Sequence, residues 1–249
     1  MACIGWLRIT AVGFATVLAT AIPFARRYGA PSAARYAAIA LGAFGIQQVA
    51  VHRALSCVPE GEPRELDAVD ALTLSRGLCA AIVAGAAVSG VRERDGHAGR
   101  LAWPLALSGA TLTDWIDGPL ARRRGRGPTR LGRILDLEVD SWLTLATTLA
   151  AVRLGTLHPL CLITPLLRYA AMVTPLSYGD VFAVGKTERA RNLGIAQMTL
   201  TLASFAPFAG AMTVRLASLA SLVLLPIHVG ALLAAVPARR AAPGSAAPH

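Results

Sequence analysis

Apolar residues occur along this chain in blocks of roughly twenty, separated by shorter polar or arginine-rich stretches. A block of that length matches the hydrocarbon thickness of a bilayer, and the blocks are continuous rather than alternating as the strands of a membrane barrel are. Because lipid offers the backbone no hydrogen bonds, the pattern predicts an all-α integral membrane protein. The membrane-spanning helices are predicted over residues 4–24, 34–51, 71–91, 101–120, 134–152, 160–176, 193–212 and 216–236.

Composition and charge agree with a membrane protein. Hydrophobic residues make up 55% of the chain and charged residues only 15%, whereas a soluble domain carries about 25% charged residues. The net charge of +10 comes almost entirely from arginines, and arginines between spans set topology and contact anionic lipid headgroups. With no nucleic-acid-binding motif visible, we expect the partner of this charge to be the bilayer and not a nucleic acid. An even number of spans places both termini on one side, and the arginine bias favours the cytoplasm for that side.

Carboxylates are scarce, with 14 in the chain, yet a cluster of them lies at the end of the fourth predicted span and the start of the fifth. An acidic side chain at a membrane-embedded helix end is costly, so the cluster is a candidate functional site. Residues three or four apart share a helix face, which makes two pairs of aspartates and leaves one glutamate on the opposite face. The pairs are Asp114 with Asp117 and Asp136 with Asp140, and the glutamate is Glu138.

Four carboxylates at one depth would repel one another unless a cation neutralised them. Hard oxygen ligands favour magnesium, manganese or calcium over zinc. Small residues, Gly118, Ala121 and Gly132, lie among the acids and let a ligand or a helix approach the backbone. Arg122 follows directly and can pair with a phosphate. Together these features predict a site for a diphosphate.

The spacing of these residues forms a recognisable motif, which is Asp114-x-x-Asp117-Gly118-x-x-Ala121-Arg122, nine residues, then Gly132-x-x-x-Asp136-x-x-x-Asp140. It resembles the signature of the CDP-alcohol phosphatidyltransferase family, with a slightly longer spacer after Arg122. The run Leu72-Thr73-Leu74-Ser75-Arg76 is similar to the Leu-Thr-x-x-Arg element that opens the family's first core helix. The resemblance implies a six-helix transmembrane core bundle over residues 71–236, preceded by two extra N-terminal transmembrane helices within 1–58 and a linker or interfacial segment at 59–70. Residues 237–249 are expected to form a disordered tail.

The resemblance also implies an activity. The chain is expected to transfer a phosphatidyl or other substituted phosphate group from a CDP-alcohol, with CDP-diacylglycerol the leading candidate, to an acceptor alcohol with release of CMP, in phospholipid biosynthesis. Mg²⁺ or Mn²⁺ would be held by Asp114, Asp117, Asp136 and Asp140, and Asp140 would also be the general base. The nucleotide would contact Thr73, Gly118, Ala121, Arg122 and Gly132. The resemblance leaves a homodimer open.

The acceptor alcohol stays open, because the residues around the second aspartate pair and near Lys186 depart from the patterns of many family members. Five cations could line a pocket for a phosphorylated acceptor: Arg133, Arg168, Lys186, Arg189 and Arg191. A cytoplasmic loop signal explains the Lys186 group equally well.

Two other functions agree less well with the sequence. A membrane prenyltransferase would need a second aspartate-rich motif, but only Asp180 and Glu188 follow Asp140. A transporter should show an internal repeat, which is not visible, and intact aspartates disfavour a non-enzymatic scaffold.

Overall fold

The computed structural model describes residues 2–56, 66, 68–89, 106, 109–110, 130–166, 196, 198–203 and 211–240. Within these ranges the regular structure is helical throughout and no strand occurs. The main helices are α1 (Ala2–Tyr28), α2 (Ala30–Ser56), α3 (Ala68–Val88), α5 (Arg130–Arg153) and α9 (Ala211–Arg240), and a short 3₁₀ helix, η2 (Pro159–Leu162), follows α5. The all-α class is therefore confirmed for the described residues, while the arrangement of six core helices after two extra ones stays a prediction.

The predicted spans at 4–24, 34–51, 134–152 and 216–236 lie inside longer helices, because hydropathy detects only the apolar part of a helix. The first helix shows the reason. It continues past its apolar block through Arg26 and Arg27, and it ends at Gly29, whose φ of 86° is accessible to glycine at little cost. The Gly29 amide donates to the Ala25 carbonyl at 2.8 Å, and α2 begins at the next residue. The two helices thus form a hairpin with a one-residue connection.

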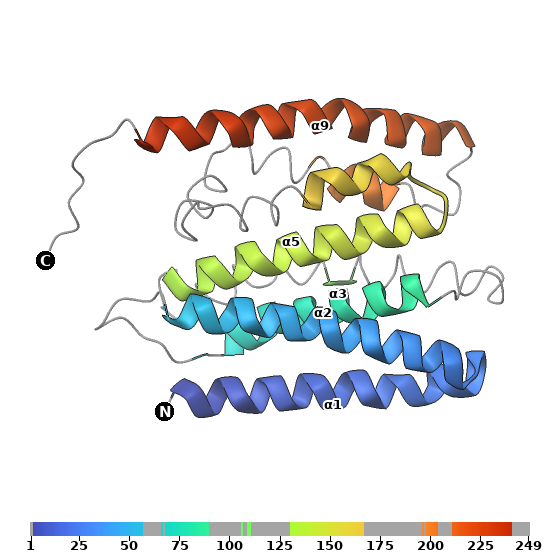
Figure 1. Cartoon of the computed structure of the whole chain (residues 1–249), viewed down its shortest axis with the longest axis vertical. Helices are drawn as coiled ribbons and strands as arrows, with labels where there is room; N and C mark the ends of the chain where they lie inside the picture. The colour runs from blue at the N-terminus through green and yellow to red at the C-terminus, as the bar shows by residue number, and fades with distance from the viewer. Residues whose placement is uncertain are drawn as a thin grey trace, which may run out of the picture.

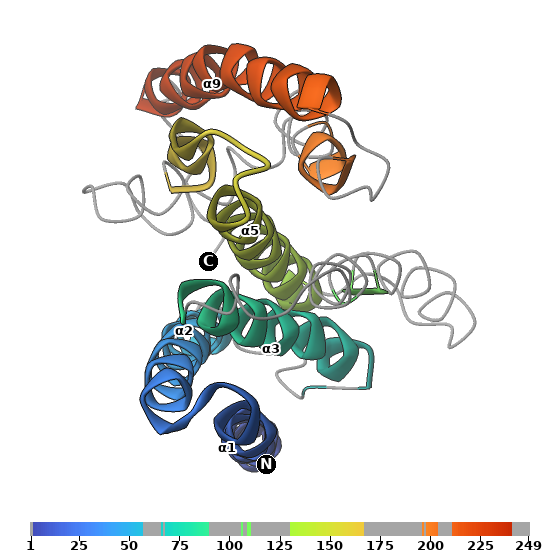
Figure 2. The same cartoon turned by 90° about the vertical axis from the view of Figure 1, so that its right-hand side faces the viewer.

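The helices pack in sequence order at the N-terminal side of the molecule (Figure 1). α2 packs against both α1 and α3, and α3 makes its most extensive contacts with α5. The view along the helices shows α5 leading from this group toward α9 (Figure 2). α3 and α5 run in the same direction, opposite to α2 and α9, so the N-terminal end of α1 and the C-terminal end of α9 lie at one end of the molecule (Figure 1).

Small residues allow α2 to dock closely on α3. A Cβ atom placed on Gly85 would lie 2.8 Å from the Ala40 Cβ and 2.9 Å from the Tyr36 carbonyl oxygen, both on α2. Two turns earlier on α3, Gly77 lies against the buried side chain of Gln47. Glycines on a helix face let neighbouring backbones approach, which is a common means of packing helices in lipid. Gly77 and Gly85 thus form a glycine stripe on α3, and α2 of the α1–α2 hairpin packs against this stripe.

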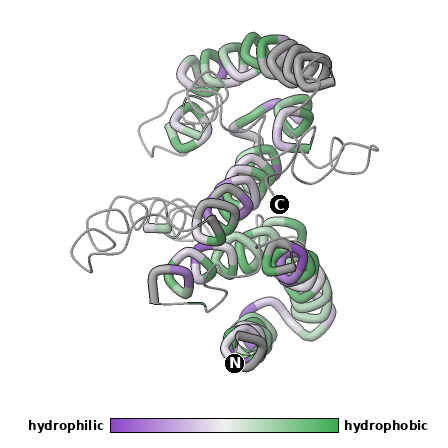
Figure 3. The backbone as a smooth tube through the Cα atoms, turned by 90° about the vertical axis from the view of Figure 1, so that its left-hand side faces the viewer, coloured by the Kyte–Doolittle hydropathy of each residue, from purple (hydrophilic) through white to green (hydrophobic). Residues whose placement is uncertain are grey.

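The exposed surface of the described helices carries large apolar side chains. On α1, Leu7, Val12, Leu18 and Ile22 are each more than half exposed. The backbone of α5, which carries both hydrophilic and hydrophobic positions, runs through the middle of the described helices (Figure 3). Of its polar side chains, Glu138, Thr147 and Thr148 are buried. Two described segments are long and apolar enough to cross a membrane, Gly5–Tyr28 and Asp70–Val88.

Candidate functional site

The candidate site lies where α3 and α5 pack, and its central residue is an arginine within the apolar helix α3. The Arg76 side chain is 2% exposed. A guanidinium buried so deeply requires charged or polar partners, because burying an unpaired charge is very costly. Its partners come from the first half of α5.

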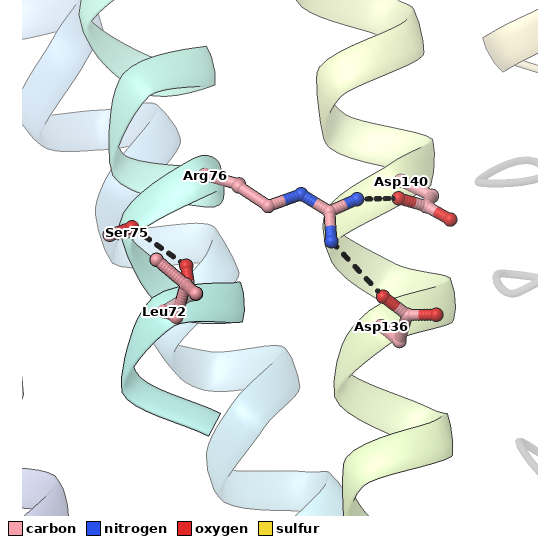
Figure 4. A network of polar contacts seen from close by, with 5 residues as sticks. All are labelled: Leu72, Ser75, Arg76, Asp136 and Asp140. Carbon is pink, nitrogen blue, oxygen red and sulfur yellow. Dashed lines mark hydrogen bonds and ion pairs between the residues drawn. The ribbon is translucent and has the colours of Figure 1, made fainter. Parts of the chain in front are cut away.

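One guanidinium spans both aspartates of α5 (Figure 4). Nη1 of Arg76 donates to Oδ1 of Asp136 at 3.2 Å, and Nη2 donates to Oδ1 of Asp140. The second oxygen of each carboxylate points away from Arg76 (Figure 4). The spacing of four residues, which predicts a shared helix face, is what brings both carboxylates within reach of one side chain.

The ion-paired cluster of Arg76, Asp136 and Asp140 is buried in the protein on one side and accessible to solvent on the other, which we call its open side. Arg76 is buried, whereas the side chains of Asp136 and Asp140 are 50% and 47% exposed. Glu138, two residues from each aspartate, is only 1% exposed and lies on the other face of α5. Of the three carboxylates on this helix, the two aspartates are therefore the ones that a ligand can reach.

Hydroxyl groups further along α5 bond to their own helix. Thr144 donates to the Asp140 carbonyl at 2.7 Å, Thr147 to the Leu143 carbonyl at 2.6 Å and Thr148 to the Thr144 carbonyl at 2.8 Å. Such bonds satisfy a hydroxyl inside an apolar environment. The Asp140 carbonyl oxygen therefore accepts a hydrogen bond from the Thr144 side chain, within the turn of α5 that carries the Asp140 carboxylate.

The donor set of the cluster fits a hard divalent cation. Each of the two carboxylates has one oxygen turned away from Arg76, and both aspartate side chains are about half exposed (Figure 4). Mg²⁺ is commonly held by one or two carboxylates together with water and substrate phosphates. Among the residues that the structure describes, there is no group of three or more His, Cys, Asp or Glu side chains that could hold a metal. Two of the four predicted ligands belong to the described part.

The other predicted site residues fall into two groups. Thr73 is buried on α3, one turn before Arg76, and Gly132 lies in α5, one turn before Asp136. The backbone of Arg133 is part of α5. The remaining predicted residues lie outside the described ranges: Asp114, Asp117, Gly118, Ala121, Arg122, Arg168, Lys186, Arg189 and Arg191.

Arg76 was not predicted to be a site residue, although it ends the Leu72–Arg76 element. The available signal was an arginine within an apolar run of helix length, since such residues normally face the bundle and pair. What the sequence does not contain is the identity of the partners, which lie about sixty residues away on another helix.

Comparison with known proteins adds one finding. A family model described as CDP-alcohol phosphatidyltransferase matches residues 68–236, which is more than half of the chain. No curated protein and no solved structure matches. The match begins at the first residue of α3 and contains Arg76, Asp136 and Asp140, while α1 and α2 lie outside it.

Proposed function

Because the chain belongs to the CDP-alcohol phosphatidyltransferase family, we propose that it transfers a phosphatidyl group from CDP-diacylglycerol to an acceptor alcohol and releases CMP. The family is one of membrane transferases that act on a CDP-alcohol donor and an alcohol acceptor in phospholipid biosynthesis. The observation that carries the proposal is the aspartate pair of α5, half exposed on one side and held by a buried arginine on the other.

We propose that Asp136 and Asp140, together with Asp114 and Asp117, hold Mg²⁺ or Mn²⁺. A bound divalent ion would supply positive charge for the donor's diphosphate and for the departing CMP. Asp136 and Asp140 support this role because each has one oxygen turned away from Arg76 (Figure 4). Five further residues are proposed to contact the nucleotide, namely Thr73, Gly118, Ala121, Arg122 and Gly132.

Asp140 is the proposed general base. An alcohol hydroxyl is a weak acid, so its attack needs a base within hydrogen-bonding reach. The acceptor oxygen would bond to the phosphorus next to the lipid alcohol, the bond from that phosphorus to the CMP oxygen would break, and the hydroxyl proton would pass to Asp140. The half-exposed carboxylate of Asp140 is compatible with this role.

The acceptor is proposed to be phosphorylated, such as glycerol 3-phosphate or an inositol phosphate. The cations proposed to bind its phosphate are Arg133, Arg168, Lys186, Arg189 and Arg191. Arginines in such a pocket can form two parallel bonds to a phosphate.

We further propose a multi-pass membrane protein with two extra helices before the catalytic core and a site that faces the cytoplasm. The predicted bounds of the core, at 71 and 236, are too narrow, because α3 begins at Ala68 and α9 ends at Arg240. The proposed linker therefore ends before Ala68, and the proposed tail begins after Arg240. The apolar surface of α1 and the two helices long enough to span a bilayer support the membrane location. A homodimer stays a prediction. The family match disfavours the prenyltransferase, transporter and scaffold alternatives.

The test is release of CMP by the purified full-length chain in lipid nanodiscs with Mg²⁺ or Mn²⁺. The donor is CDP-diacylglycerol, and the acceptors are glycerol 3-phosphate, inositol phosphate and their unphosphorylated alcohols. We expect release with one phosphorylated acceptor, and a fall of about 10²–10⁴-fold in Asp140→Asn, as for loss of a general base. Nucleotide binding should survive in Asp140→Asn. Folded wild-type protein that released no CMP from CDP-diacylglycerol with any of these acceptors would refute the proposal.

A further inference from the structure

The ion pairs of Arg76 with Asp136 and Asp140 form a bridge from α3 to α5. Arg76 itself is not one of the proposed metal ligands. We propose that Arg76 is a positioning residue for the metal site, which holds one oxygen of Asp136 and one of Asp140 so that both second oxygens face the open side. The inference rests on the proposed function, because it takes these two aspartates as metal ligands.

The geometry of the contact supports positioning rather than simple charge compensation. Two separate N–H groups of one planar guanidinium each donate to a different carboxylate (Figure 4). Without such a partner, two like-charged carboxylates one turn apart repel and rotate independently. A guanidinium presents its donors in a rigid planar arrangement, whereas a lysine ammonium is a point charge on a flexible stem. Arg76 can therefore fix the relative orientation of both carboxylates, and a lysine at this place cannot.

Burial separates the role of Arg76 from that of a substrate-binding cation. The side chain of Arg76 is 2% exposed, and those of its two partners are about half exposed. A ligand approaching from the open side meets the carboxylates first and leaves the guanidinium behind them. Outer partners of this kind orient metal ligands and contribute strongly to metal affinity.

A buried apolar cluster packs next to both helices that the ion pairs of Arg76 connect. Leu74, two residues before Arg76, belongs to a buried cluster with Val51 of α2 and with Leu131 and Leu135 of α5. Leu135 directly precedes Asp136, so the same cluster supports both ends of the ion-paired bridge. Close-packed side chains of this kind hold rotamers and backbone rigidly.

The experiment measures Mn²⁺ affinity by electron paramagnetic resonance on the full-length chain in nanodiscs, without substrate. Arg76→Lys keeps the positive charge and removes the pair of guanidinium hydrogen bonds to Asp136 and Asp140. We expect its Kd for Mn²⁺ to rise by about 10–100-fold, the usual effect of losing an outer partner of a metal ligand. Arg153→Lys is the matched control, because Arg153 joins the other end of the same two helices through a bond from Nε to the Ala87 carbonyl at 3.2 Å. Its Kd should equal that of the wild type.

The outcomes separate the possible roles. An Arg76→Lys protein that is folded and binds Mn²⁺ as tightly as the wild type, or more tightly, overturns the positioning role and leaves only a structural bridge. If Arg76→Lys does not fold, Arg76→Gln is measured by the same criterion, and weaker binding supports positioning even though a repelling charge has been removed. Failure of the wild type to bind Mn²⁺, or unchanged binding in Asp136→Asn, would instead refute the proposed metal site itself.

Discussion

Neighbouring carboxylates on one helix can have different roles when the helix presents them to different surroundings. Glu138 is 1% exposed on one face of α5, and Asp136 is half exposed on the other. We therefore expect Glu138→Gln to keep Mn²⁺ affinity and most CMP release, whereas Asp136→Asn should weaken Mn²⁺ binding at least about tenfold, as expected when the metal site is disturbed.

Any cost of Glu138→Gln should fall on stability, by about 1–3 kcal/mol, because a buried hydrogen-bonding group is being altered. Paired measurements of Mn²⁺ affinity, CMP release and thermal unfolding on the two variants check this division. Equal losses of metal affinity in both would show that the two faces of α5 are not functionally distinct.

At the residue scale, the sequence predicted what local periodicity determines. Spacing alone places Asp136 and Asp140 on one face and Glu138 on another, because a helix repeats every 3.6 residues wherever it packs. Periodicity could not identify Arg76 as a residue of the site. Its contacts depend on how α3 packs against α5, and a solitary arginine in an apolar run indicates that a partner exists without identifying it.

At the element scale, the existence of the helices could be predicted and their bounds and contacts could not. Hydropathy located the apolar centres of α1, α2, α3, α5 and α9. It could not place the ends, since α1 continues through two arginines until Gly29 adopts a positive φ. Nor could it pair the helices, because a glycine in a sequence does not reveal which neighbour approaches it.

The close approach of α2 to α3 leads to a stability prediction. Gly85→Ala would place a Cβ 2.8 Å from that of Ala40 and 2.9 Å from a backbone oxygen of α2. The helices must then move apart, and overpacking of this kind costs about 1–3 kcal/mol. Gly42→Ala is the control, since nothing lies within 4 Å of its added Cβ.

Alanine favours a helix over glycine by up to about 1 kcal/mol, so the control should be neutral or slightly stabilising. Thermal unfolding of both variants in the same nanodiscs gives the comparison. A Gly85→Ala protein as stable as Gly42→Ala would mean that α2 does not dock against α3 through this stripe.

At the scale of the whole molecule, the helices outside the family match are part of the support for the site. Val51 of α2 packs in one buried cluster with Leu131 and Leu135, directly before Asp136. Trp6 and Ile9 of α1 pack against the same cluster. The α1–α2 hairpin thus contacts the helix that carries both aspartates, although the family match begins only at α3. The N-terminal helices therefore support the turn of α5 that carries Asp136, one of the proposed metal ligands.

The direction of the helices also gives a prediction about membrane topology. The N-terminal end of α1, the C-terminal end of α9 and the end of α5 that carries Asp136 and Asp140 lie at the same end of the molecule (Figure 1). The junction between α1 and α2, near Ala30, lies at the opposite end (Figure 1). If these helices cross the bilayer, both termini share a compartment with the aspartates, and Ala30 faces the other.

We expect tags at the N-terminus and the C-terminus to report the cytoplasm in intact cells, because the arginine bias favours that side. Ala30→Cys, in a chain whose four native cysteines are replaced, should react with a membrane-impermeant maleimide added from outside. The exposed position of Ala30 makes the label accessible. A cysteine placed after His249 is the control and should react only after the cells are opened. Tags on opposite sides would contradict the arrangement of α1 and α9, whereas both tags outside would keep the arrangement and reverse the orientation of the site.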